Sequence, residues 1–406
     1  MSFIIVRKSL SNFYVLIPFL LVFVGAIFLK IHHPTGSILK ISAFVYMIVY
    51  VISHQKINKN QLGMTLLFLP LLTYGVLHSF NLMAGIEDGL RYLFPIVSLF
   101  YGYSIRKYLD IVVKFIIFFV AINFFIQVIN YINWFEGVRQ WFYPVTVNGE
   151  WYFNQAAGIL RASGLVVYFC FFGYMNMIAY FIIKKYYFGK FKKILLGISL
   201  AMLLASLSYK TIISFIVVLG FYHYKKILNI FTGLVVLIIG VFMMYPIQMK
   251  QFASSLLYRF NSYILMKTPT VRSETYMLMW RDILSFDLFG HGVGAFGGPA
   301  SLKYNSPYYA EVNFTWPDTF WMKMTTVDTF PPHVFIELGI VGGLLFFLVL
   351  IVPLIKKKVN AMILIIYFTL FFDMLFTFSL ASLEYMMFSL VLIYPICFYK
   401  SYEGKS

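Results

Sequence analysis

Residues 333–354 read HVFIELGIVGGLLFFLVLIVPL, and this stretch decides the class of fold. Beyond Glu337 it carries no charged residue. A helix that crosses a bilayer needs about 20 predominantly apolar residues. The stretch is therefore predicted to be a membrane span, and Pro331 and Pro332 suit its first turn.

The rest of the chain repeats this composition. Of 406 residues, 61% are hydrophobic and 12% are charged, whereas a soluble domain has about 25% charged residues. We predict an all-α polytopic membrane protein with about twelve transmembrane helices. The predicted spans lie near 12–29, 38–53, 62–78, 89–105, 111–130, 164–183, 193–208, 211–224, 227–246, 333–354, 360–378 and 384–399.

The distribution of Lys and Arg predicts the orientation. If both termini are cytoplasmic, 19 of the 32 basic residues fall in the inner segments, which are short. This is the positive-inside pattern of membrane insertion. It accounts for most of the formal charge of +17, so no nucleic-acid partner is expected.

The predicted spans divide the chain into three parts. Residues 1–246 form a membrane domain with spans one to nine and an outer loop at 131–163. Residues 247–332 form a large outer loop, and residues 333–406 return to the membrane as spans ten to twelve. Long loops on a rigid scaffold commonly carry function. We therefore expect the active face to be the outer one.

Within the large loop, residues 271–285 are predicted to form an amphipathic helix. Tyr276, Met279, Trp280, Ile283 and Leu284 share one stripe at helical spacing. If that stripe packs on the membrane body, Arg272 at its edge points inward and Arg281 points outward. The alternative is that both arginines are solvated or face lipid headgroups.

A glycine-rich run follows this helix. Gly292, Gly294 and Gly297 form a literal G-x-G-x-x-G. The motif indicates a dinucleotide site only between a strand and a helix, and no parallel sheet is predicted here. A tight turn is expected, and exposed backbone N–H groups for an anion are the alternative.

His333 and Glu337 stand four residues apart at the start of the tenth span, so they share a helix face. A helix N-terminus disfavours imidazolium, so His333 could act as a neutral general base for a hydroxyl. The alternative is an interfacial histidine and a locally paired glutamate.

Other charged residues lie near the predicted spans. Arg91, Arg161 and Lys210 are at the outer ends of predicted spans. Asp373, deep in the eleventh span, should face the interior and have a partner.

Other chemistries have little support. Cys170 and Cys397 both lie inside apolar runs, and no metal-binding motif is present. We expect neither a metal nor a cofactor.

The pattern resembles the superfamily of bacterial O-antigen polymerases and O-antigen ligases, which are glycosyltransferases of GT-C-like architecture. The similarity rests on the predicted spans and the large loop before the tenth. It also rests on Arg272 with Trp280 and the run 290–296, on the segment 333–343, and on Arg161-Ala-Ser-Gly164.

The resemblance implies metal-independent, inverting transfer of undecaprenyl-diphosphate-linked oligosaccharide on the outer face of the bacterial cytoplasmic membrane. Arg272 and Arg161 match diphosphate-binding positions, and His333 matches a loop histidine that assists the attacking hydroxyl. The catalytic role of Glu337 is our own inference, as is diphosphate binding by Arg91. Besides lipid-linked substrate and bilayer, a chain-length regulator and a flippase are the partners that such an enzyme would have.

Departures from the ligase pattern favour the polymerase branch. Lys210 stands where many ligases carry arginine, and lysine cannot grip phosphate bidentately. Val334 stands where ligases tend to have asparagine. Two alternatives stay open: a ligase that moves polymer onto lipid A-core, and a flippase or other transporter of lipid-linked oligosaccharide.

Overall fold

The computed structural model is mostly helical. It describes residues 2–31, 33–138, 146–147, 150–151, 155–156, 158–166, 168–222, 270–314, 318–319, 322–323, 327–355 and 359–399, with single residues at 250, 254, 257 and 261. The α-helices are α1 (Ser2–Ile31), α2 (His33–His54), α3 (Lys59–Leu77), α4 (Leu82–Ser104), α5 (Leu109–Phe135), α6 (Phe169–Tyr186), α7 (Lys192–Ala205), α8 (Tyr209–Tyr222), α11 (Val271–Leu284), α12 (Pro299–Lys303), α13 (Tyr308–Glu311), α14 (Phe330–Ile351), α15 (Ala361–Met374), α16 (Leu383–Met387) and α17 (Leu390–Phe398).

The remaining elements are short. Two 3₁₀ turns, η2 (Val352–Ile355) and η3 (Ser379–Ala381), flank α15. Three two-stranded antiparallel hairpins pair β1 (Thr146–Val147) with β2 (Glu150–Trp151), β3 (Gln155–Ala156) with β4 (Ile159–Leu160), and β5 (Asp318–Thr319) with β6 (Met322–Lys323).

The predicted spans can be compared with these helices. The ninth, 227–246, lies outside the described residues, and each of the others coincides at least partly with a helix. In the described part of the chain, four helices are long and apolar enough to cross a membrane: Pro34–His54, Lys59–Leu77, Leu109–Phe135 and Phe330–Ile355. The predicted hairpin of spans seven and eight is α7 and α8, each of 14 residues and therefore about 21 Å long.

The surface of the long helices indicates a lipid environment. Along α2, the exposed side chains include Ile38, Ile41, Val45, Val49 and Ile52, which recur at helical spacing. Inside the bundle, by contrast, several amides are buried, among them Gln61, Asn123 and Asn176. A soluble protein rarely exposes such a continuous apolar face.

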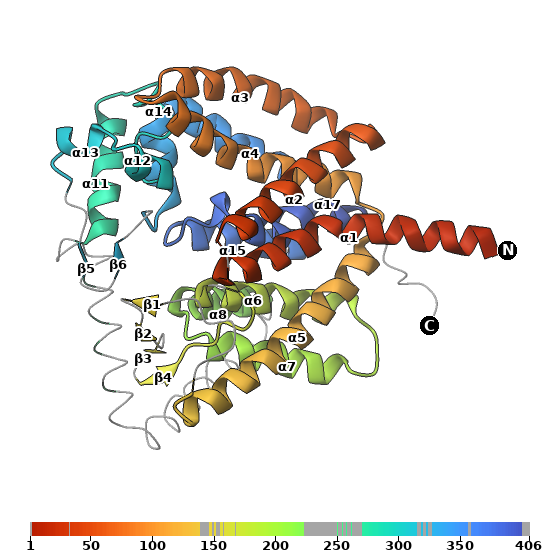
Figure 1. Cartoon of the computed structure of the whole chain (residues 1–406). Coiled ribbons are helices and arrows are strands. Elements are labelled where there is room, and N and C mark those ends of the chain that lie inside the picture. Colours follow the sequence, from red (N-terminus) through yellow and green to blue (C-terminus); the bar gives the residue numbers. More distant parts are fainter. Residues whose placement is uncertain are drawn as a thin grey trace.

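The helix ends gather at two opposite ends of the bundle. At one, which we call the basic end, Ser104 Oγ donates to the Lys56 carbonyl (3.2 Å) and the Tyr186 and Tyr399 rings are 5.2 Å apart. At the other, the loop end, Lys40 pairs with Glu384. Figure 1 shows α11 at the loop end, running across the ends of α3, α4 and α14 rather than along them.

The helix α14 is broken at Gly339, whose φ of 66° and ψ of −172° are not helical. The segment 287–292 docks at the break. His291 N–H and Gly292 N–H donate to the carbonyls of Ile336 and Glu337 at 2.9 and 3.1 Å. In return, Ile340 N–H and Val341 N–H donate to the carbonyls of Asp287 and Leu288 at 3.0 and 3.1 Å. Non-helical backbone inside a membrane protein is tolerated where the protein satisfies it in this way.

Candidate functional site

His333 lies in the first turn of α14 and is enclosed, with only 1% of its surface exposed. Its Nδ1 is hydrogen-bonded to the Phe296 carbonyl, which can only accept. The proton of the neutral ring is therefore on Nδ1, and Nε2 keeps its lone pair. Tyr92 stacks on one face of the ring at 5.3 Å, and Phe378 packs edge-on at 4.8 Å. A substrate would reach Nε2 only if one of these neighbours moved.

Glu337, one turn further along, is fully buried. One carboxylate oxygen accepts from the Tyr92 hydroxyl at 2.9 Å, and the other accepts from Phe296 N–H at 3.1 Å. The His333 Nδ1 atom is 3.6 Å from Glu337, beyond hydrogen-bond distance. Glu337 therefore holds the segment that orients His333, and both its oxygens are already engaged.

Arg91 precedes Tyr92 on α4 and pairs with the buried carboxylate of Asp88. Its charge acts on both His333 and Glu337. One turn earlier, Glu87 binds Lys303 at 2.5 Å, which ties α12 to α4. The start of α4 therefore brings a cation to the His333 region.

Arg272, in the first turn of α11, pairs with Asp328. A second contact, 3.0 Å between the Thr275 and Thr329 hydroxyls, fixes α11 to the residues that lead into α14. Arg281 lies on another face of the same helix. Its side chain is 50% exposed, whereas that of Arg272 is 24% exposed. This agrees with the prediction that Arg272 points inward and Arg281 outward.

The predicted packing stripe of this helix is wrong in part. Met279 is buried as expected, but Trp280 and Leu284 are exposed, and the polar Thr275 and Asp282 are buried instead. The prediction assumed that the apolar stripe of this helix packs against the rest of the protein, and at Trp280 and Leu284 it does not.

Lys210, in the first turn of α8, is engaged within the bundle. Its Nζ lies 2.9 Å from Asp373 Oδ1 and also contacts the Thr377 hydroxyl. This confirms that Asp373 faces inward and has a partner. Arg161 stacks over the Phe169 ring at 4.1 Å, and the charges of Arg161, Lys210 and Asp373 all act on Cys170.

The loop end thus brings the predicted residues into two groups. Arg91, His333 and Glu337 form one group, and Arg161 and Lys210 form the other. Thr377 and Phe378, which are adjacent, contact Lys210 and His333 respectively and so link the groups. Arg272 joins through Asp328, five residues before His333. Four further residues of the site were not predicted: Tyr92, Phe296, Asp328 and Phe378. Tyr92 directly follows Arg91 in the sequence, but no sequence signal identified the other three.

The glycine run forms a tight, docked turn. Gly290, Gly292, Gly294 and Gly297 all have positive φ. A Cβ at Gly292 would lie 2.6 Å from the His78 carbonyl oxygen. The N–H groups of residues 291–293, 296 and 297 all donate to protein acceptors. The alternative of an anion-binding run of N–H groups is therefore wrong for these five positions.

A buried polar cluster lies behind the exposed side of α11. Asp282 accepts from His291 Nε2 (3.2 Å), the Tyr308 hydroxyl (2.8 Å) and the Arg281 guanidinium (3.0 Å). The hydrogen bond to Asp282 raises the pKa of His291 above its ordinary value, against the opposing effect of burial. Burial alone would raise the pKa of Asp282, but these hydrogen bonds, led by that from His291, lower it below its ordinary value.

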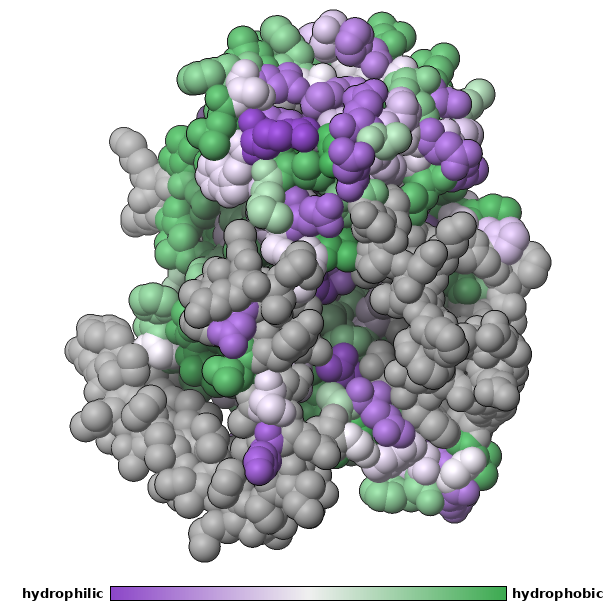
Figure 2. All heavy atoms as spheres, turned by 90° about the vertical axis from the view of Figure 1, so that its left-hand side faces the viewer, coloured by the Kyte–Doolittle hydropathy of each residue, from purple (hydrophilic) through white to green (hydrophobic). Residues whose placement is uncertain are grey.

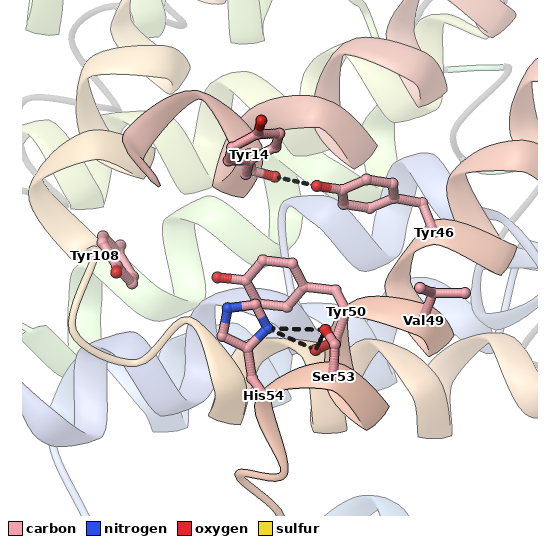
Figure 3. A pocket seen from close by; sticks show the side chains of 7 residues that line it. All are labelled: Tyr14, Tyr46, Val49, Tyr50, Ser53, His54 and Tyr108. Atoms are coloured by element: carbon pink, nitrogen blue, oxygen red, sulfur yellow. Dashed lines mark hydrogen bonds between the residues drawn. The ribbon is translucent and has the colours of Figure 1, made fainter. Parts of the chain in front are cut away.

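The described part of the chain has no metal-ligand cluster, and a cavity found in it lies away from the candidate residues. Among the residues that the structure describes, no group of three or more His, Cys, Asp or Glu side chains is arranged to hold a metal ion. A cavity of about 260 Å³ lies elsewhere, between α1, α2 and the start of α5 (Figure 3). Its lining includes Tyr50, His54 and Tyr108, which belong to the basic end, and none of the candidate residues.

Comparison with known proteins adds no family to this description: no protein-family model matches the chain, and none of the curated proteins matches it.

Proposed function

We propose that this protein is a membrane glycosyltransferase that polymerises undecaprenyl-diphosphate-linked oligosaccharide repeats on the outer face of the cytoplasmic membrane. The observation that carries the proposal is the gathering of four cations and one base-competent histidine at one end of the bundle. The cations, Arg91, Arg161, Lys210 and Arg272, come from separate segments of the chain.

The proposed chemistry uses each group for one task. Once Tyr92 or Phe378 has moved away from the ring, the acceptor hydroxyl transfers its proton to His333 Nε2 as its oxygen forms a new bond to the donor sugar C1. The bond from C1 to the lipid diphosphate breaks on the opposite side, and the diphosphate leaves with the electron pair. The cations stabilise the charge that develops on the leaving group. One such fixed donor contributes about 10²–10³-fold in rate, and a general base about 10²–10⁴-fold.

Two features support the outward-facing, twelve-span arrangement in this proposal. The connections α2–α3, α4–α5 and α6–α7 lie at the basic end, where the positive-inside rule places the cytoplasm. The connections α3–α4, α7–α8 and α15–α16 lie at the loop end with the candidate site. The alternation agrees with spans that cross in turn.

The test is a gel of surface polysaccharide from a deletion strain that carries either the wild-type chain or Arg272→Ala. We expect Arg272→Ala to leave core bearing a single repeat unit and to abolish the long ladder, since a diphosphate contact is lost. Arg281→Ala is the matched control, because it removes an arginine from the same helix at an exposed position; its ladder should remain.

Other patterns on the gel would contradict the proposal. Core without any repeat, together with accumulated lipid-linked polymer, would identify a ligase. Lipid-linked repeats retained on the cytoplasmic side would identify a flippase. Equal loss of ladder in both arginine variants would refute the role assigned to Arg272.

A further inference from the structure

The exposed side of α11 and the turn after it are mainly apolar, although they belong to the outer loop segment. On α11, the exposed positions Met277, Trp280 and Leu284 are 50%, 53% and 74% exposed and follow each other at helical spacing. Arg281, which is 50% exposed, borders these apolar positions on one side. Three other polar residues of the helix, Ser273, Thr275 and Asp282, are buried against the protein. This is the reverse of the polarity of a helix at a water-facing surface.

The turn continues the same surface. Phe286, Leu288 and Phe289 are exposed, and Phe286 is the most exposed of them at 78%. Phe286 also has a φ of 58°, a left-handed backbone that is uncommon for a bulky residue. Such a conformation persists only where the surrounding structure fixes it. Here it directs a phenylalanine away from the protein.

The neighbouring part of the loop segment has a different surface. At and after α12, the exposed residues are mainly polar and include Lys303, Asn305, Glu311 and Asn313. Figure 2 shows hydrophilic side chains gathered over the upper part of the face where α11–α13 lie, with hydrophobic side chains along its edges. The segment 270–314 therefore has a polar side and an apolar side.

The apolar side is continuous with the surface of α3, one of the helices able to span a membrane. The Phe289 ring meets the Tyr74 ring at 5.7 Å, and Val293 N–H donates to the Gly75 carbonyl at 2.9 Å. Just beyond, Leu77 is exposed. Adjoining surfaces contact the same environment. Because α3 is long and apolar enough to cross a membrane, we take that environment to be lipid.

From these observations we infer that the Met277–Trp280–Leu284 side of α11 and the turn 284–289 are inserted into the bilayer, while α12 and α13 face water. A helix that lies in the interface with an apolar face in lipid is stabilised by the area that it buries there. The inserted turn would hold α11, and with it Arg272, at a fixed depth beside the membrane. This inference depends on membrane embedding and not on the proposed transferase activity.

Site-specific fluorescence in proteoliposomes tests the inference. Leu284→Cys and Phe286→Cys would each be labelled with an environment-sensitive dye in a Cys170→Ala/Cys397→Ala background. Ala310→Cys, on the exposed side of α13, is the matched control. Lipids with a nitroxide on the acyl chain should quench the first two labels severalfold more than the control, and aqueous iodide should do the reverse.

Two outcomes would overturn the inference. Equal quenching of all three labels by iodide would place α11 in water. Protection of the Leu284 and Phe286 labels from both quenchers would mean that protein, such as a second copy of the chain, covers this surface. Trp280→Cys, labelled in the same way, provides a second readout if one turn variant does not fold.

Discussion

At the scale of single residues, Gly339 is a position that must lack a side chain. Its φ of 66° is left-handed, and a Cβ there would overlap the backbone nitrogen of Phe289. The break in α14 and the docked segment 287–292 both depend on this position having no side chain.

We therefore expect Gly339→Ala to destabilise the protein. A φ of 66° with a ψ of −172° is a backbone conformation that essentially only glycine adopts, and it costs another residue about 1–3 kcal/mol. The clash with Phe289 adds to this. The measurement is thermal unfolding in detergent. Gly63→Ala is the control, because a methyl group on this α3 glycine would meet no other atom within 4 Å and should add up to about 1 kcal/mol of helix stability. A Gly339→Ala melting temperature equal to wild type would contradict the assigned role.

Glu337 was predicted to be catalytic, but in the structure its carboxylate holds neighbouring residues in place. Its oxygens accept from Tyr92 and from Phe296 N–H, and Phe296 in turn accepts from His333. Four positions apart on a helix, histidine and glutamate do share a face, as the sequence predicted. What the spacing could not predict was that one loop residue, Phe296, would form hydrogen bonds with both side chains.

At the scale of elements, the attachment of α11 should depend on pH through His291 and Asp282. The charged and titratable groups around His291 are Asp282, Asp287, Glu311, Arg281 and Tyr308. The raised pKa of His291 gives stability that is complete below about pH 6.5 and is lost as the pH rises through the folded-state value. The lowered pKa of Asp282 gives stability present above about pH 3.9 and lost on further acidification.

Hydrogen–deuterium exchange of α11 at a series of pH values would measure this dependence, after correction for intrinsic exchange. Protection should be greatest between about pH 4 and 6.5 and should decline above that range. In His291→Gln, the amide can donate to Asp282 at any pH, so the decline above neutrality should disappear. A decline that persists in His291→Gln would assign the effect to another group.

The helix α11 also shows where sequence reasoning reached its limit. Its bounds were predicted closely from the helical spacing of its apolar residues, and the structure adds a capping box formed by Thr270 and Ser273 at its start. The buried side was mispredicted at Trp280 and Leu284. Amphipathic patterns identify two faces, but which one meets protein depends on whether the other meets water or lipid.

At the scale of the whole molecule, the two ends of the bundle predict a topology. Alkaline phosphatase is active only where its disulfides can form, outside the cytoplasm. Alkaline phosphatase fused to the chain after Ser79 or after Asn305, which lie at the loop end, should therefore be active. Fusions after Gln55 and Gly189, at the basic end, should be inactive. Activity at Gly189 equal to that at Asn305 would refute the alternation.

The long apolar runs predicted most helices because lipid imposes both their length and their composition. The ion pairs Arg272–Asp328 and Lys210–Asp373 were harder to predict, since their partners are 56 and 163 residues apart. Asp373 was expected to have a partner because an isolated charge in lipid is costly. Nothing in its local sequence identified Lys210.

The broken helix α14 has a consequence for how the chain is assembled. In an isolated α14, the break would leave two N–H groups and two carbonyls without the partners that 287–292 supplies, and each costs several kcal/mol in hydrocarbon. Residues 330–351 should therefore leave the insertion machinery as an unbroken rod. The ribosome has already made the docking segment by then, so Gly339 would change conformation only when that segment arrives, as a late step in biogenesis.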